Sequence, residues 1–357
     1  MVVKFSNCGH LLAISSRTAT VSPSFADVNS PTMSASYVYG LRLYDIDADV
    51  EVWADLGAHH STVYDVQWSD NDAYIITGAG DGTCKVWDVS CLLGRPMDKP
   101  NVLTEVPYLL RTLECRPPVF VYCAIFQEFG RSTLTGVVSK SSDIGGVNNI
   151  PRVICGASDG KIRVFDNGAL VGKISSSDPS DDVAPHGGRV NALCIDKRSK
   201  YLMSGCSDGE ILVWRLDRNG WYNLLRKFKR DGPSAMLRNN STATLHGVAS
   251  ADTSVGVISL TAHPDKARGQ LLALSQPFNL RVYNVNTYKI QSQCPAVSHA
   301  QQRQLSFCRA GLSADGSFAV CQIAGADEEV SVHIFKPVAT RIFTINVAIF
   351  MNSPQLA

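Results

Sequence analysis

The sequence predicts an all-β protein built from one repeating unit of four short strands. Three kinds of short run, in which apolar residues alternate with polar ones, recur in a fixed order along the 357 residues. One unit reads HHSTVYDVQWSDNDAYIITGAGDGTCKVWDV from His59, and another reads HGGRVNALCIDKRSKYLMSGCSDGEILVWRL from His186. Polar turns join the runs, including an Asp-Gly pair typical of a tight hairpin. A less regular run, such as NLLRKFKR at 223–230, supplies the fourth strand.

The spacing of four side chains indicates that these two units are copies of each other. In the first unit, His59 stands 22 residues before Asp81, and Trp87 stands six residues after it. Thr77 stands four residues before the same Asp. The second unit repeats these intervals with residues of the same kind, which are His186, Ser204, Asp208 and Trp214. Agreement at every position predicts an internal repeat.

A weaker copy lies between the two. VFVYCAIF at 119–126 matches the first strand and VICGASDGKIRVFD at 153–166 matches the next two, with 22 inserted residues between them. Asp159 keeps its place in this copy. Its partner positions are assigned to other residue types, namely Pro117, Cys155 and Phe165. We therefore expect Asp159 to contribute less to stability than Asp81 does.

Three further copies keep only the apolar pattern. Six sheets of four antiparallel strands are typical of the blades of a β-propeller. We expect a single domain over residues 1–357, with six recognisable blades and a seventh that is partial or missing. The expected blades are roughly 1–57, 58–115, 116–183, 184–253, 254–300 and 301–338, followed by 339–357 as a partial last blade or tail.

Two further expectations concern the insertions and the ends of the chain. Ser-, Thr- and Gly-rich stretches are expected to form loop insertions at 17–36, 128–149 and 231–255. Aligning VKFS with VQWS places Met1 in the middle of a first strand. Because an open propeller would expose a sheet edge, we expect a truncated chain rather than a six-bladed ring.

The tails GAGDGTCKVWD and SGCSDGEILVW resemble the signature of WD40 repeats, with Ala58-His59 in place of a Gly-His pair. The resemblance implies a buried structural network in which Asp81 accepts a hydrogen bond from His59, which reaches Thr77 and then Trp87. His186, Ser204, Asp208 and Trp214 would form the same network in the fourth unit. A Ser-His-Asp hydrolase uses similar residue types, but it needs one exposed nucleophile with an oxyanion hole. Two equivalent buried copies favour scaffolding, so no catalytic residue is predicted.

The order of the units resembles the jouberin family of ciliary WD40 proteins. The resemblance rests on VYDVQWSDNDAYIITGAGDGTCKVW, on a proline-led PPVFVYCAIF unit and on a Trp-less unit ending in LRVYNV. It implies a non-enzymatic, cytoplasmic protein-interaction scaffold at the cilium basal body and transition zone. Its partners would be ciliary or centrosomal proteins, and its role would lie in cilium biogenesis and the cytoskeleton.

The alternative is a WD40 adaptor of another cytosolic complex, either a ubiquitin-ligase substrate receptor or a trafficking assembly. Ligase receptors of this fold often carry Trp-Asp-x-Arg. Here Trp87-Asp88-Val89-Ser90 lacks the Arg, which weakens that alternative.

The family resemblance also predicts where partners bind. In WD40 rings, one position on each inner strand and one before each turn Asp line the top of the central channel. Those positions here are Tyr64, Tyr122, Asn191, Gly80, Ser158 and Ser207. Two tyrosines on one rim favour an interaction hot spot, although they could merely pack the channel. Arg116 and Arg189 precede their strands and would favour an acidic or phosphorylated partner.

Composition argues against several other functions. A net charge of +1 provides no field for nucleic acid, and no run approaches the roughly 20 apolar residues of a membrane helix. The eleven cysteines form no CxxC pairs, which fits neither a disulfide framework nor a zinc site. We therefore expect reduced thiols, no metal, no cofactor and no direct membrane insertion.

Overall fold

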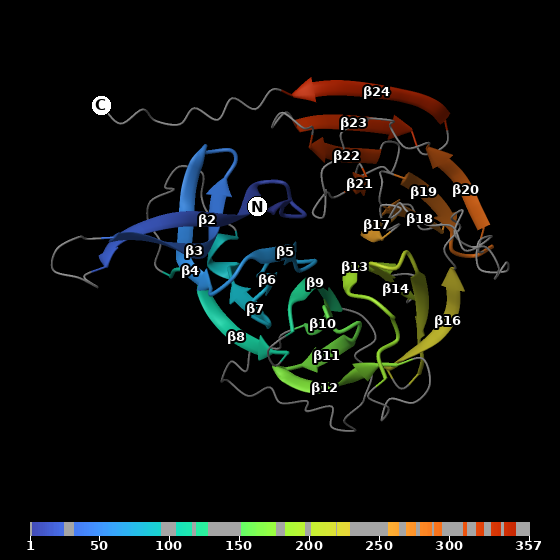
Figure 1. The fold of residues 1–357 in the computed structure, drawn as a ribbon, viewed down its shortest axis with the longest axis horizontal. Helices are drawn as coiled ribbons and strands as arrows, with labels where there is room; N and C mark the ends of the chain where they lie inside the picture. Colours follow the sequence, from blue (N-terminus) through green and yellow to red (C-terminus); the bar gives the residue numbers. More distant parts are fainter. Residues whose placement is uncertain are drawn as a thin grey trace, which may run out of the picture. The chain divides into compact units, whose positions relative to one another are not determined.

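Six four-stranded antiparallel sheets contain all the strands that the structure describes. In this computed structural model, every sheet is a meander whose strands pair in chain order (Figure 1). No helix in the described part of the chain is long and apolar enough to cross a membrane. The described residues are 2–24, 32–93, 105–115, 119–127, 151–175, 183–196, 201–218, 220–228, 256–263, 269–275, 279–287, 289–294, 310–312, 319–324, 330–336 and 339–347.

The chain divides into two compact units. The first comprises residues 1–185 with 217–221, and the second comprises 186–216 with 222–357. The all-β prediction is confirmed, whereas the single domain and its blade boundaries stay predictions.

The first unit holds three sheets. The first sheet contains β1 (Val3–Phe5), β2 (Leu11–Ser24), β3 (Thr32–Asp45) and β4 (Val50–His59). The second contains β5 (Val63–Trp68), β6 (Tyr74–Ala79), β7 (Thr83–Asp88) and β8 (Tyr108–Glu114), with a short 3-10 helix η1 (Ser90–Leu92) after β7. The third contains β9 (Val121–Gln127), β10 (Arg152–Ala157), β11 (Ile162–Asp166) and β12 (Ala169–Ile174).

The second unit holds the other three sheets. Its first sheet contains β13 (Val190–Asp196), β14 (Tyr201–Cys206), β15 (Ile211–Leu216) and β16 (Tyr222–Phe228). The next contains β17 (Val257–Ala262), β18 (Gln270–Ser275), β19 (Asn279–Asn284) and β20 (Lys289–Cys294). The last contains β21 (Ala310–Leu312), β22 (Ala319–Ala324), β23 (Val330–Lys336) and β24 (Ala339–Val347).

Residues 339–347 differ from the expectation that 339–357 form a partial last blade or a tail. They form β24, which pairs with β23 from Val330↔Val347 to Lys336↔Ala339. The sixth sheet needs this strand to satisfy the backbone groups on the outer side of β23. Residues 348–357 lie outside the described part of the chain.

The predicted loop insertion at 17–36 is also wrong in large part. Strands β2 and β3 continue into it as a hairpin, with a regular register from Leu11↔Asp45 to Ser24↔Thr32. The stretch RTATVS alternates polar and apolar residues, and this period of two suits a strand better than a loop. The insertions at 128–149 and 231–255 lie outside the described residues.

The conformation of the tight turns explains why an Asp-Gly pair occurs in each well-matched unit. The glycines that follow the three turn aspartates have positive φ, at 81° for Gly82, 74° for Gly160 and 83° for Gly209. Glycine adopts this left-handed conformation without a steric penalty, whereas a side chain would strain it.

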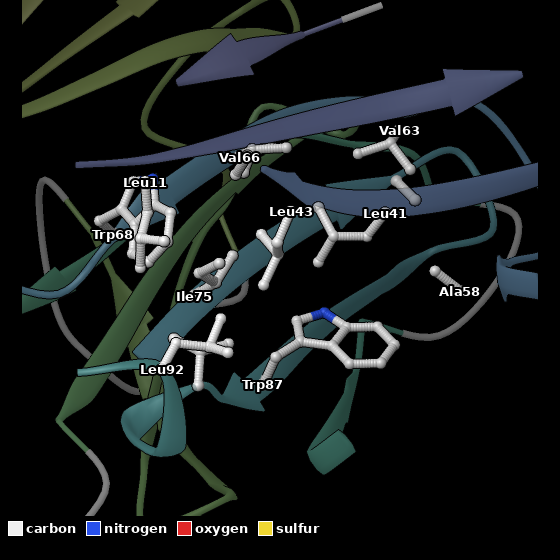
Figure 2. Close-up of a cluster of buried hydrophobic side chains, with 13 residues drawn as sticks. Leu11, Leu41, Leu43, Ala58, Val63, Val66, Trp68, Ile75, Trp87 and Leu92 are labelled. Carbon is white, nitrogen blue, oxygen red and sulfur yellow. The ribbon is translucent and has the colours of Figure 1, made fainter. Parts of the chain in front are cut away.

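One hydrophobic cluster of the first unit lies between its first and second sheets, as Figure 2 shows. Leu41 and Leu43 from β3 are fully buried with Ile75 of β6 and Trp87 of β7. Trp53 meets Trp87 edge to face, with ring centroids 5.6 Å apart. Burying each large aliphatic side chain contributes about 1.5–3 kcal/mol to stability. The packing of these side chains therefore holds the two sheets together.

Candidate functional site

A chain of hydrogen bonds crosses the second sheet from Trp87 to Asp81. Trp87 Nε1 donates to Thr77 Oγ1 at 3.2 Å, and Thr77 Oγ1 lies 2.7 Å from His59 Nε2. His59 Nδ1 lies 2.9 Å from Asp81 Oδ2. The His is supplied by the end of β4, and its partners come from β6, β7 and the turn between them. The chain therefore ties the fourth strand of one sheet to the next sheet.

Burial sets the protonation state of this network. Desolvation lowers the pKa of His59, although the Asp81 carboxylate opposes the shift. The imidazole is then neutral at pH 7, with its proton on Nδ1, which donates to Asp81 while Nε2 accepts from Thr77. Burial disfavours the charged form of Asp81, but hydrogen bonds from His59, Thr83 and the His60 backbone hold its pKa well below its usual range.

The equivalent network in the second unit is shorter. His186 Nε2 lies 2.7 Å from Ser204 Oγ, and Trp214 Nε1 donates to the same oxygen at 2.9 Å. His186 Nδ1 is buried and has no hydrogen-bond partner among the described residues. The expected bond to Asp208 is therefore wrong. Desolvation, with a smaller contribution from Lys227, lowers the pKa of His186 to about 4.

The residues after His186 explain why Asp208 turns away. The Asp208 carboxylate lies over the chain at Gly187 and Gly188, where a Cβ would come within 2.9 Å and 2.4 Å of its oxygens. The missing side chains leave room for this orientation. Asp208 is exposed and accepts a hydrogen bond from Ser207 Oγ at 3.3 Å.

The third sheet replaces the network with an ion pair and two thiols. Arg163 donates to Asp159 Oδ1 at 3.0 Å and to Oδ2 at 2.6 Å. The expectation that Asp159 lacks partners is therefore wrong. Cys155 occupies the hydroxyl position of β10, and the Sγ of Cys115, which follows β8, lies 3.5 Å from it. Cys115 thus takes the position of the His, which the sequence comparison assigned to Pro117, a residue outside the described part.

These arrangements stabilise the sheets and provide no catalytic group. The hydroxyls of Thr77 and Ser204 are fully buried, and each is already engaged by an indole and an imidazole. A nucleophile must instead face a substrate beside hydrogen-bond donors for the oxyanion.

Two groups of side chains in the described residues have donor atoms close enough to hold a metal ion. In the first unit, the group consists of Cys84, Cys115 and Cys155. In the second unit, it consists of His186, Cys206 and Glu210. Glu210 in the latter is already paired with Lys227 at 2.7 Å.

The predicted partner-binding residues of the first unit form an aromatic cluster. The rings of Tyr64 on β5 and Tyr122 on β9 lie with centroids 4.8 Å apart. Phe120, just before β9, meets Tyr122 edge to face at 6.5 Å and is 44% exposed. Sequence reasoning missed Phe120, because it stands before its strand rather than at an expected channel position. We call Tyr64, Phe120 and Tyr122 the aromatic face.

Two small residues support this face. Gly80 is buried, with Ser61 and the Tyr64 ring against it, and its role as a partner contact stays a prediction. Its amide donates to the Thr62 carbonyl at 2.9 Å. Ser158 is half-buried, and its Oγ accepts a hydrogen bond from the Phe120 amide at 3.0 Å.

The remaining predicted contacts lie in the second unit or outside the described residues. Asn191 donates to the Val257 carbonyl at 2.9 Å, which holds β13 to β17. The Ser207 amide donates to the carbonyl of the exposed Arg189 at 2.9 Å. Arg116 lies outside the described part of the chain.

Repeated four-stranded meanders with buried His–hydroxyl–Trp contacts are characteristic of WD40-repeat β-propellers. In agreement, residues 51–88 and 179–215 match the family described as "WD domain, G-beta repeat". WD40 propellers are in general non-enzymatic and bind other proteins.

Several known proteins resemble this chain over about half its length. Mouse jouberin is 26% identical over 182 residues, which cover 49% of this chain and 13% of jouberin. The pig protein named cilia- and flagella-associated protein 52 is 25% identical, covering 45% of this chain and 26% of its own. The fruit-fly protein lethal(2)denticleless is 25% identical, covering 45% and 17%. The matched region is therefore about a quarter or less of each relative.

A solved structure supports the fold over nearly the whole chain. A chain of the structure titled "Crystal Structure of Mitotic Checkpoint Complex" superposes with a TM-score of 0.57. The match covers 96% of this chain and 75% of that one at 12% identity. The predicted WD40 propeller fold is confirmed.

Proposed function

We propose that this chain is a non-enzymatic scaffold that binds another protein through the aromatic face of its first unit. The observation that carries the proposal is the contact between Tyr64 and Tyr122, with the exposed ring of Phe120 beside them. Aromatic side chains dominate the binding energy of many protein interfaces, because they bury much area at little entropic cost.

The aromatic face is held in place before any partner arrives. The Phe120 amide donates to Ser158 Oγ, and the Ser158 amide donates back to the Phe120 carbonyl at 2.9 Å. A preorganised surface loses less conformational freedom on binding, which favours affinity. Arg116, Arg189, Asn191 and Ser207 remain proposed contacts for an acidic or phosphorylated partner.

We propose the base of the cilium as the place where this scaffold acts. The order of its repeats and the match to jouberin support this location, as does the match to a relative named for cilia and flagella. A second candidate function is an adaptor of another cytosolic complex. Its support is that lethal(2)denticleless matches a similar share of the chain at similar identity.

Endogenous tagging in ciliated cells tests location and surface together. The tagged chain is expected at the cilium base, and proximity labelling should identify its neighbours there. Phe120→Ser with Tyr122→Ser should remove those neighbours while the melting temperature is kept. The control is Leu170→Ser with Val171→Ser, which changes two apolar residues of β12 that are each 48% exposed.

The outcomes separate the two functions. Loss of neighbours in the aromatic variant alone supports the proposed face. A tagged chain that stays away from cilia, with neighbours from a ligase or coat complex, supports the second candidate. Identical neighbours for both variants would exclude the aromatic face.

A further inference from the structure

Three cysteines that are far apart in the sequence meet inside the first unit. Cys84 lies on β7, Cys115 follows β8 and Cys155 lies on β10. Their three Sγ atoms lie within 4.8 Å of one another, and those of Cys115 and Cys155 are 3.5 Å apart. All three side chains are buried, with exposures of 0%, 4% and 0%. The cluster combines residues of two neighbouring sheets.

These separations are close to those that a single metal ion requires. Metal–thiolate bonds of about 2.3 Å place the sulfur atoms of one site roughly 3.8–4.0 Å apart. The three thiols could therefore close around one ion by movements of about 1 Å or less, without rearranging the strands. Cysteines that serve only as packing groups need not bring three sulfur atoms from separate segments to one point.

A buried cation lies beside the thiols. The Arg163 side chain is 7% exposed, and its bidentate pair with Asp159 fixes it beside the thiols. A buried cation of this kind offsets part of the charge of a metal–thiolate group.

The number and type of ligands select among metals. Ile76, Val86, Val121 and Phe165 pack in the same cluster as the thiols, so apolar side chains surround much of the site. No fourth His, Cys, Asp or Glu among the described residues belongs to the group. Structural zinc is almost always four-coordinate, whereas monovalent copper accepts two or three thiolates and prefers soft ligands.

We propose that Cys84, Cys115 and Cys155 form a buried three-thiolate site for one Cu(I) ion. Each thiol that binds releases its proton to solvent, and the copper remains monovalent, so no oxidant or reductant takes part. Because the site is closed to solvent, the ion enters while the chain folds or while the unit opens locally.

The test uses the full reduced chain, refolded without oxygen with Cu(I) and a competing Cu(I) chelator. One copper per chain should resist competition, and X-ray absorption should report sulfur neighbours only, at a coordination number of two to three. Cys155→Ala removes a ligand and should weaken copper retention at least as much as loss of an outer-shell partner does, which is about 10–100-fold. Cys123→Ala is the matched control, because Cys123 is a buried thiol of the same sheet outside the group.

Several results would overturn the proposal. One is copper retention that is equal in both variants. Another is preferential retention of Zn(II) in a parallel refolding. A third is a reduced protein that binds neither metal, which would leave the thiols as packing groups. Mass spectrometry distinguishes the redox alternative, since a Cys115–Cys155 disulfide would remove two hydrogens and block copper.

If the Cys155 variant fails to fold, absorption data on the wild-type protein still decide the ligand set. A copper site with nitrogen or oxygen neighbours would contradict the proposed three-thiolate site. This test is independent of the proposed function. The copper site is judged by metal content, whereas the aromatic face is judged by partner binding.

Discussion

Arg163 donates hydrogen bonds to both carboxylate oxygens of Asp159, whereas Asp81, the equivalent turn aspartate of the second sheet, is bound by His59. The second and third sheets thus pair their turn aspartate with different side chains, a histidine in one and an arginine in the other. In each, a turn aspartate holds a cationic or polar side chain that would otherwise be buried alone.

Asp159→Ala should destabilise the protein by roughly 2–4 kcal/mol, because it leaves the Arg163 guanidinium buried without its partner. Urea unfolding followed by circular dichroism measures the loss. The double variant Asp159→Ala with Arg163→Met removes both charges and should recover part of it. A single-variant loss below about 0.5 kcal/mol would show that the pair does not matter for stability.

Asp81→Ala and Asp208→Ala should have different effects, although the two residues occupy the same position in the repeat. Asp81 accepts hydrogen bonds from His59, the His60 amide and Thr83, so its loss should cost roughly 1–3 kcal/mol. Asp208 is exposed and makes no bond to His186, so its loss should cost about 0.5 kcal/mol or less. Equal shifts in thermal melts would contradict the difference between the two networks.

Stability should fall as the pH is lowered from about 6.5 toward 4, because His186 must remain neutral in the folded chain. Its pKa is lowered from 6.5 to about 4, so in this window the unfolded chain binds the extra proton and the folded chain does not. Stability therefore rises with pH there, by up to roughly 3 kcal/mol. His186→Gln should flatten the slope between these values, measured by urea unfolding at a series of pH values. An unchanged slope would show that other groups govern the acid sensitivity.

Gly205→Ala should destabilise the second unit by roughly 1–3 kcal/mol through overpacking. A Cβ at Gly205 would lie 2.5 Å from Val257 Cγ1, whereas one at Gly311 would meet nothing within 4 Å. Gly311→Ala is therefore the control and should be nearly neutral in a melting experiment. Adding Val257→Ala to Gly205→Ala should restore part of the loss if the clash is its cause.

The repeat network around His59 could be predicted because the resemblance to WD40 repeats implies it and the spacing of its residues supports it. The same spacing led to a wrong prediction at Asp208, which does not bind His186. Two glycines allow the Asp208 carboxylate to turn away, and the spacing of residues in a sequence does not specify that rotation. Cys115 could have been found: its 44-residue distance to Asp159 becomes 22 once the inserted 22 residues are removed. Pro117 stands four residues before Val121, as His59 stands four residues before Val63, and this interval favours Pro117 instead.

The long hairpin and the thiol cluster show two other limits of sequence reasoning. The Ser and Thr content of 17–36 suggested a loop, although its alternation was that of a strand. Cys84, Cys115 and Cys155 carry no short motif, since only the pairing of neighbouring sheets brings them together. Motifs of local spacing cannot detect such sites.

Strands β2 and β3 extend beyond the strands on either side of them (Figure 1). On one side β1 pairs only with Leu12–Ile14 of β2, and on the other side β4 pairs with β3 only as far as Tyr39. From Thr18↔Val38 to Ser24↔Thr32, over a length of about 20 Å, the two strands pair with no other strand of the described residues. A two-stranded ribbon alone is marginally stable in water. Its amide protons should therefore exchange with solvent well before those of the blade from which it extends, and its hydrogen bonds can open and reclose while that blade stays folded.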